Sequence, residues 1–227
     1  MTFIIIDYSK GNLRSVQKGF ELAGAKAVIS SSETDIRAAE ALILPGVGSF
    51  ADAAIAMEEM GQMQAIRDQI DAGVPFFGIC LGMQLLFDCG NEGTPKGTWT
   101  QGLGILRGQC ERITSTDAQG RSYKIPHVGW NQVIFSSQLG KLSENTELER
   151  LFAGIEDGSH FYFTHSYGCS PTQTKDVLAT VTHANTFPCA VGKDKVFGVQ
   201  FHPEKSSHKG LAVMANFVKL VKEGTSR

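Results

Sequence analysis

An α/β fold, with an open and mostly parallel central sheet flanked by helices, is predicted by three features of the sequence. Short apolar runs such as Phe3–Ile6 and Ala41–Leu44 are typical of parallel strands, which are buried on both faces and therefore apolar throughout. Segments with helical spacing of apolar residues separate these runs, as crossover connections between parallel strands require. Beyond Asn91, glycine-rich loops and further strand-like runs indicate an additional antiparallel strand region.

The first part of the chain alternates strands with helices. Leu13, Val16 and Phe20 recur at helical spacing, and Ser32 precedes two acidic residues, as a helix cap does. We expect strands at Phe3–Ile6, Ala27–Ile29, Ala41–Leu44 and Val74–Ile79, and helices after Asn12, after Ser32 and over Phe50–Met60 and Gln62–Ala72. The last of these strands leads into Cys80, at the carboxyl edge of the sheet where α/β proteins place their sites.

The second part of the chain is expected to be richer in strands. Turn residues at Asp117–Gly120 separate two strand-like runs. The expected strands are Cys110–Thr114, Tyr123–Ile125, His160–His165, Val177–Thr182 and Val196–Phe201, with a short helix at Thr146–Phe152 and an amphipathic helix at Leu211–Val221.

The composition predicts one domain over residues 1–227. A chain of 227 residues with 42% hydrophobic content can bury a substantial core, and no linker or repeat interrupts it. The net charge is −2 and the basic residues are scattered, so we expect no nucleic-acid or membrane partner. The N-terminus has no basic leader and no membrane-length apolar run occurs, so we expect a cytoplasmic protein.

The cysteines and histidines do not have the spacing of a metal site. The five cysteines are odd in number, widely separated and never in a Cys-x-x-Cys pair, which argues against a disulfide framework and a zinc site. We therefore expect free thiols, no metal and no cofactor.

The segment Gly78–Gln84 has the form of a nucleophile elbow. Cys80 lies between two glycines directly after an apolar run, and such an elbow needs small neighbours around a strained nucleophile at a strand-to-helix turn. The N-terminus of the following helix would favour the thiolate. The alternative is a small buried hydrophobic cysteine, the usual role of a free thiol.

A cysteine nucleophile needs a base and a residue that orients the base. His202 and Glu204 follow an apolar strand, and in an extended chain residues two apart face the same side and can meet. The alternative is a polar turn at a strand end.

Amide chemistry also needs donors for the developing oxyanion, which backbone N–H groups supply. One donor is expected at Leu81, the residue after the nucleophile. The other is expected in the glycine-rich loop Pro45–Ser49. Such loops also bind phosphate, but this one matches neither the dinucleotide nor the P-loop pattern.

Gly78–Gln84 together with Gln200–Glu204 resembles the class I glutamine amidotransferases. The wider set of motifs resembles the glutaminase subunits of imidazole glycerol phosphate synthases and covers essentially the whole chain. These motifs are Asp7-Tyr8, Gly11–Leu13, Pro45–Phe50, Pro126–Asn131, His165–Tyr167 and Gln200–Ser206. Ser9 departs from the pattern, which usually has glycine there. The resemblance implies a class I glutamine amidotransferase-like fold.

The resemblance also implies a mechanism. Cys80 attacks the side-chain amide of glutamine, His202 takes the thiol proton and returns it to the leaving ammonia, and Glu204 orients His202. Water then hydrolyses the γ-glutamyl thioester. The oxyanion is held by the amides of Leu81 and, after a backbone rearrangement, Val47. The residues that match glutamine-binding positions are Gly48, Gln84, Glu92, Ser166 and Tyr167. Glu92 alone could equally be a solvated acid.

By the same resemblance, the ammonia passes to a separate cyclase subunit of (β/α)₈ fold, which forms a heterodimer with this chain and makes imidazole glycerol phosphate in histidine biosynthesis. Trp130 is the candidate interface anchor, since tryptophans supply large buried area at binding surfaces, and Asn12 lies in the expected partner-facing loop. A core tryptophan is the alternative.

Three other functions remain open at this stage. The chain could serve pyridoxal phosphate synthase, although the loop Pro45–Gly48 differs from the Gly-Gly-Glu-Ser type of those glutaminases. It could be a paralogue serving a sugar-modifying synthase. It could also be a non-catalytic binding subunit, against which the intact set of Cys80, His202 and Glu204 argues.

Overall fold

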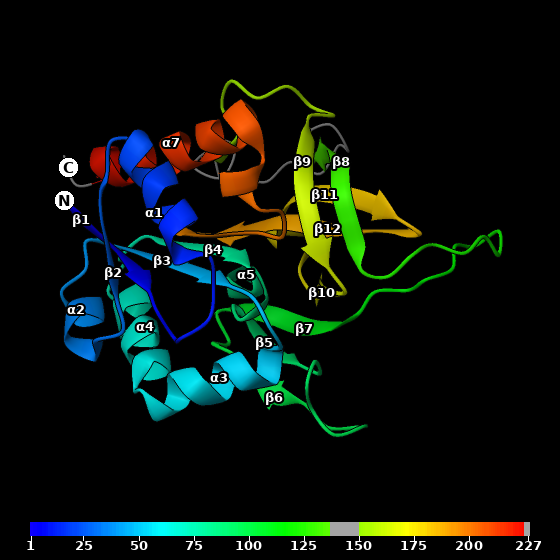
Figure 1. Ribbon diagram of the computed structural model, residues 1–227, viewed down its shortest axis with the longest axis horizontal. Coiled ribbons are helices and arrows are strands. Elements are labelled where there is room, and N and C mark those ends of the chain that lie inside the picture. The colour runs from blue at the N-terminus through cyan, green and yellow to red at the C-terminus, as the bar shows by residue number, and fades with distance from the viewer. Residues whose placement is uncertain (137–149, 225–227) are drawn as a thin grey trace.

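One long sheet runs through the molecule and joins a parallel half to an antiparallel half (Figure 1). The computed structural model describes residues 1–136 and 150–224. Within these residues the sheet has nine strands in the order β2-β1-β3-β4-β13-β12-β11-β8-β9. Their bounds are β1 Thr2–Ile6, β2 Lys26–Ser30, β3 Ala41–Gly46, β4 Phe76–Cys80, β8 His127–Phe135, β9 His160–His165, β11 Val177–His183, β12 Asn185–Lys193 and β13 Val196–Val199.

The change of direction occurs at β13. The pairs β2-β1, β1-β3, β3-β4 and β4-β13 are parallel, whereas β13-β12 and every later pair are antiparallel. The predicted α/β class is therefore confirmed. The antiparallel strands extend the central sheet, and further strands form a second sheet with both parallel and antiparallel pairs.

Helices cover both faces of the parallel half. On one face lie α1 (Leu13–Leu22) and α7 (Ser207–Gly224), and on the other lie α3 (Phe50–Glu59) and α4 (Gln62–Asp71), with α2 (Glu33–Arg37) beside α4 (Figure 1). The alternation of β1 explains why its sequence is apolar throughout: Phe3 and Ile5 pack toward α1 and α7, and Ile4 and Ile6 toward α3 and α4.

A smaller sheet lies beside the carboxyl end of β4. Its order is β10-β7-β5-β6, with bounds β5 Phe87–Gly90, β6 Thr100–Gln101, β7 Leu106–Arg112 and β10 Tyr167–Pro171. The helix expected after Cys80 is the single turn α5 (Leu81–Gln84), because the chain enters this sheet at Phe87. The residues at this junction are fully buried and belong to the core: Met83, Leu85, Leu86 and Phe87.

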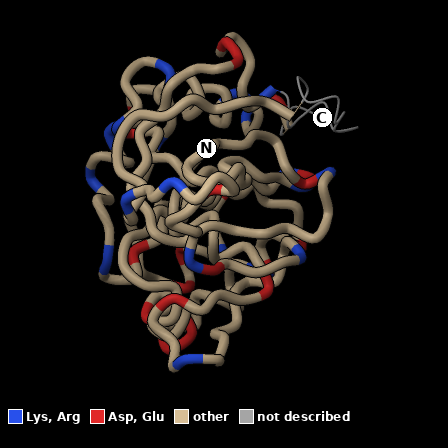
Figure 2. The backbone as a smooth tube through the Cα atoms, turned by 90° about the vertical axis from the view of Figure 1, so that its right-hand side faces the viewer, with Lys and Arg blue, Asp and Glu red and all other residues tan. Residues whose placement is uncertain are grey.

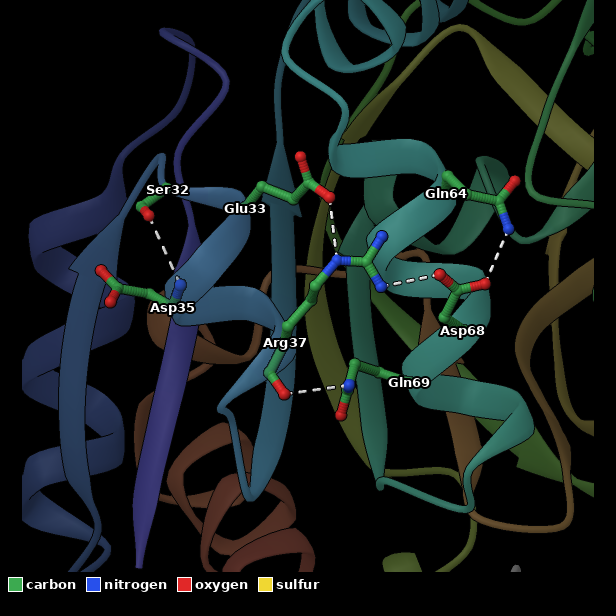
Figure 3. A network of polar contacts seen from close by, with 7 residues as sticks. All are labelled: Ser32, Glu33, Asp35, Arg37, Gln64, Asp68 and Gln69. Carbon is green, nitrogen blue, oxygen red and sulfur yellow. Dashed lines mark hydrogen bonds and ion pairs between the residues drawn. The ribbon is translucent and has the colours of Figure 1, made fainter.

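The short helix α2 begins and is anchored as its sequence suggests. The Asp35 amide donates to the Ser32 hydroxyl at 3.4 Å, so the predicted cap is present. Arg37 at the other end joins α2 to α4, donating to Glu33 at 2.8 Å and to Asp68 at 2.7 Å (Figure 3). Gln64 donates in turn to Asp68 at 2.7 Å.

The strand predicted at Tyr123–Ile125 is wrong. None of these residues is in a strand, and the isolated bridge around the turn at Asp117 joins Thr116 to Ser122, just before the segment. Nε2 of His183 donates to the Lys124 carbonyl at 2.9 Å, so a side chain satisfies this backbone where a strand would have been needed.

Two other elements differ from expectation. β13 ends at Val199, and the 3₁₀ helix η3 (Pro203–Lys205) follows; another, η2 (Thr174–Asp176), precedes β11. Of the helix expected at Thr146–Phe152, the residues before 150 lie outside the described part of the chain.

The surface carries charges of both signs. Figure 2 shows acidic and basic residues interspersed over one side of the molecule, with no extended basic patch on that side. No helix in the described residues is long and apolar enough to cross a membrane.

Candidate active site

Cys80 is the last residue of β4 and has the backbone of a nucleophile elbow. Its φ is +54°, a strained value for a residue with a side chain. The glycines around it are required by space: a Cβ on Gly78 would overlap the Gly82 carbonyl, and one on Gly82 would overlap the Leu44 carbonyl. The sequence-based interpretation of Gly78–Gln84 as an elbow thus has a steric basis.

The sulfur of Cys80 is stabilised by a side chain that the sequence analysis did not single out. Nε2 of the fully buried Gln200 donates to Sγ at 3.4 Å. The helix α5 that follows Cys80 is only one turn long, so its dipole is small. Gln200 stands two residues before His202, and its position in that motif was the available signal.

His202 and Glu204 meet through η3, and not along a continued strand as expected. Nδ1 of His202 and Oε1 of Glu204 are 2.9 Å apart, and both side chains are almost fully buried. This contact fixes the ring so that Nε2 remains for chemistry. Within the described residues Nε2 has no hydrogen-bond partner.

The environment of His202 favours its protonated form. Burial opposes the charge, but the neighbouring Cys80 sulfur and the Glu204 carboxylate outweigh it and raise the pKa of His202 to about 10. At neutral pH the imidazole therefore holds a proton, which it can donate to a leaving group.

Backbone contacts hold the His202 loop in place. The His202 amide donates to the Tyr162 carbonyl at 2.9 Å, which ties the loop to β9. The Ser206 hydroxyl donates to the His202 carbonyl at 2.7 Å and accepts from the Tyr162 amide at 2.9 Å. The base is thus positioned by β9 on one side and by Ser206 at the end of η3 on the other.

A pocket of about 320 Å³ opens in front of Cys80, large enough for an amino acid. Every predicted oxyanion and glutamine-binding residue lines it. The lining residues are Val47, Gly48, Cys80, Leu81, Gln84, Glu92, Pro126, Thr164, His165, Ser166, Tyr167, His202 and Lys205. No pocket role was predicted from the sequence for Pro126, Thr164, His165 or Lys205; three of them stand in the quoted motifs, but single residues carry no spacing signal.

Gln84 is a structural part of the pocket wall. It is 3% exposed, and its Nε2 donates to the Gln200 side-chain carbonyl at 3.0 Å and to the Tyr167 carbonyl at 3.1 Å. One continuous set of bonds therefore runs from Tyr167 through Gln84 and Gln200 to Cys80.

Glu92 is a half-buried acid, which favours the pocket role over that of a solvated surface residue. Burial is the main cause that raises the pKa of its carboxyl to about 7. The Phe50 amide lowers this pKa in part, and the nearby Asp52 raises it further. Its charge therefore changes close to neutral pH.

The loop expected to supply the second oxyanion donor lies against the chain after β1. The Tyr8 hydroxyl is buried against Gly46 and lacks a partner within the described residues. Burial raises the pKa of Tyr8, Cys80 adds to this effect, and the Val47 amide close by opposes it. That amide thus lies on the Tyr8 side of the loop.

The two candidate interface residues lie outside the pocket and are exposed. Trp130 on β8 is 54% exposed, which excludes the alternative of a core tryptophan. Asn12 is the exposed cap residue of α1. The preceding Ser9 has φ +69°, a conformation that glycine adopts without strain, which explains why glycine is usual there.

Comparison with known proteins identifies the family of the chain. A family model described as glutamine amidotransferase class-I matches residues 4–221. The imidazole glycerol phosphate synthase subunit HisH of Geobacillus thermodenitrificans is 42% identical over 222 residues, or 97% of each chain. The subunit of the same name from Moorella thermoacetica is 41% identical over 96% of this chain and 94% of that one.

Solved structures with the same fold are more distant in sequence. PurLQS from Thermotoga maritima has a TM-score of 0.69 at 18% identity and covers 96% of this chain and 97% of its own. The glutaminase domain of Trypanosoma brucei CTPS with bound acivicin has a TM-score of 0.65 at 14% identity, covering 98% and 93%.

Proposed function

The chain belongs to the class-I glutamine amidotransferase family, and from that premise we propose a role for each residue of its site. It is the glutaminase subunit of an imidazole glycerol phosphate synthase, an enzyme of histidine biosynthesis, and acts on glutamine together with a partner subunit. The observation that carries the mechanism is that Cys80 and His202 line the same pocket, with Glu204 in contact with His202.

Hydrolysis begins with the sulfur of Cys80, kept nucleophilic by Gln200 and the protonated His202. Attack on the side-chain carbonyl carbon of glutamine forms a tetrahedral oxyanion, and the His202 proton passes to the nitrogen as ammonia leaves. His202 then takes a proton from water, whose oxygen attacks the γ-glutamyl thioester and releases glutamate. Glu204 keeps the ring oriented throughout.

Two backbone amides hold the oxyanion in this proposal. The Leu81 amide begins α5 directly after the nucleophile. The Val47 amide must first turn from the Tyr8 side toward the pocket. Gly48, Gln84, Glu92, Ser166 and Tyr167 bind the rest of the glutamine. In this proposal residues 1–227 act as one glutaminase domain in the cytoplasm and use no cofactor.

We assign the partner as a cyclase of (β/α)₈ fold that forms a heterodimer with this chain. Its docking surface is proposed on β8 and the loop carrying Asn12. Val128 and Trp130 lie on the same face of β8 and are 55% and 54% exposed. β8 begins next to the pocket, because Pro126 lines it, so a partner bound there lies close to the released ammonia.

Replacing the nucleophile tests the mechanism. Cys80→Ala should bind the cyclase but lose glutamine-dependent synthesis by at least about a thousandfold, while added ammonium still supports synthesis. The measurement is product formation by the reconstituted complex with each nitrogen source. Cys189→Ala is the matched control, since that thiol is fully buried away from the pocket. Glutamine-dependent activity that survives in Cys80→Ala would show that the nucleophile is another residue.

Trp130→Ala tests the docking surface. Loss of an exposed aromatic anchor should weaken cyclase binding by about 30-fold, as measured by calorimetry, and leave the thermal stability of the free chain unchanged. Trp99, which is 39% exposed on the loop before β6, supplies the control Trp99→Ala. Equal effects of the two substitutions would contradict the assignment of β8.

A further inference from the structure

A chain of hydrogen bonds leads from β8 to the pocket, and its first member fixes the direction of all the others. Nδ2 of Asn131 donates to the Thr182 carbonyl at 2.9 Å, and its Oδ1 accepts from the Gln132 amide at 2.8 Å. A carbonyl can only accept and an amide N–H can only donate. The side-chain amide of Asn131 therefore has one possible orientation.

This orientation determines the tautomer of His127. Nδ2 of Asn131 is 3.1 Å from Nε2 of His127, so Nε2 must accept. The proton of the neutral imidazole is then on Nδ1, which donates to Nε2 of His165 at 3.0 Å. The same reasoning places the proton of His165 on Nδ1.

His165 continues this series of hydrogen bonds to the pocket wall. Its Nδ1 donates to the Tyr167 carbonyl at 2.8 Å. That carbonyl also accepts from Nε2 of Gln84, so both of its lone pairs are engaged. Tyr167 and Gln84 line the pocket in front of Cys80.

Both histidines are held neutral, so the direction does not reverse with pH. Burial is the main cause, because it disfavours a charged ring, and neighbouring histidines disfavour the positive charge further. The pKa of His127 falls to about 3 and that of His165 to about 4. The ring of His127 is further fixed between Phe163, at a centroid distance of 4.8 Å, and His183, at 4.3 Å.

We propose that Asn131 and His127 are positioning residues for glutamine binding, which act through His165 to hold the Tyr167 carbonyl and the Gln84 side chain in their binding geometry. The proposal rests on the proposed function, since it takes glutamine as the ligand of this pocket. By this proposal β8 contributes to the affinity for glutamine, although neither Asn131 nor His127 lines the pocket. Neither residue touches the reacting atoms, so the chemical step should change little.

A pair of substitutions at His127 separates polarity from packing. Phenylalanine keeps a flat ring between Phe163 and His183 but cannot accept or donate. Glutamine can accept from Asn131 and donate to His165, as His127 does. Glutamine binding is measured by calorimetry in the Cys80→Ala background, where the ligand is not consumed. His127→Phe should weaken binding by about tenfold, the order of one hydrogen bond, and His127→Gln by no more than about twofold.

Further variants distinguish a specific loss of glutamine binding from a general loss of structure. His183→Phe alters the ring stacked on His127 outside the chain of bonds and should bind glutamine as the parent does. Asn131→Leu removes the first donor at a partly exposed position and should weaken binding in the same direction, so the test holds even if His127→Phe unfolds. With Cys80 present, the glutamine KM of the complex should rise for His127→Phe while kcat stays within about twofold.

The outcomes separate the positioning proposal from the function it rests on. Equal binding by His127→Phe and the Cys80→Ala parent, or equal losses for His127→Phe and His127→Gln, would overturn the positioning role alone. A parent that binds no glutamine would overturn the proposed function and this role together.

Discussion

Two hydrogen-bonded networks in this protein use similar side chains in opposite surroundings. The first joins α2 to α4 through Arg37, Asp68 and Gln64 on the surface, where the two charged side chains are 41% and 42% exposed (Figure 3). The second joins Gln84 and Gln200 to the pocket, where both are almost fully buried. The surface bonds from Arg37 and Gln64 to Asp68, both 2.7 Å long, are shorter than the buried bonds from Gln84, at 3.0 and 3.1 Å.

The difference lies in what replaces a lost bond. Water can take over any contact of the surface network, and surface ion pairs accordingly contribute little. The buried network is shielded from solvent. A removed partner there leaves a buried donor or acceptor unsatisfied, at its full desolvation cost. The buried network can therefore fix the geometry of a site, and the surface network holds two helices together only weakly.

Replacing Gln200 should show the largest effect. Gln200→Leu leaves one N–H of Gln84 unsatisfied and removes the donor to the Cys80 sulfur. We expect the free energy of unfolding to fall by about 2 kcal/mol and kcat for glutamine to fall by at least about tenfold. Urea unfolding and steady-state kinetics of the complex measure the two quantities.

The same change in the surface network is the control. Gln64→Leu breaks the bond to Asp68 at an exposed position and should alter stability by no more than about 0.5 kcal/mol. If both substitutions cost the same, burial is not what distinguishes the two networks.

The elements that the sequence predicted best are those with a strong local pattern. β1, α1, β3 and α3 have continuous apolar runs or helical spacing, and each is present within a few residues of its expected bounds. β8 was not foreseen, because in its sequence His-Val-Gly-Trp-Asn-Gln-Val the apolar alternation of Val128 and Trp130 stops at Gln132. Its strand form comes from pairing with β9 and β11, which a local pattern does not contain.

The candidate site divides in the same way. Cys80, His202 and Glu204 carry a pattern of spacing and small neighbours that chemistry explains, and the structure brings them together. Gln200 and His165 could not be assigned roles, because a glutamine or histidine gains its role only from the partner that the fold supplies. The contact between His202 and Glu204 was expected for an extended chain but is made by a 3₁₀ turn.

Glu92 lies between the two networks in exposure and should give an intermediate, pH-dependent effect. Its pKa of about 7 lies above the ordinary value of 4.5, so its stabilising contribution is full below the ordinary value and is lost as pH rises through 7. Glu92→Gln stays neutral at every pH. The difference in the free energy of unfolding between this variant and the parent should therefore favour the variant by about 1 kcal/mol more at pH 8 than at pH 4. Thermal unfolding across this range is the measurement.

The same substitution tests the binding role of Glu92. An ionised carboxylate can accept bonds from the ammonium group of glutamine, so affinity should rise with pH through about 7 and this rise should vanish in Glu92→Gln. Asp52→Asn, at an exposed position nearby, should keep the rise. Affinity that is independent of pH in the parent would remove Glu92 from the glutamine site.

Replacing Arg37 should have the smallest effect on stability, and the dependence of this effect on salt concentration should show that it comes from surface charge. Arg37→Met breaks both ion pairs of Figure 3, yet Tm should move by no more than about 2 °C, and the difference should disappear near 1 M salt, where surface charges are screened. Arg67 on α4 is the matched control, because it donates to the Leu103 and Gly102 carbonyls at 3.1 and 2.8 Å. Arg67→Met should lower Tm further and by the same amount at low and high salt, since carbonyls have no net charge to screen. A salt-sensitive loss at Arg67, or a large one at Arg37, would contradict the distinction between networks that water can replace and networks that it cannot.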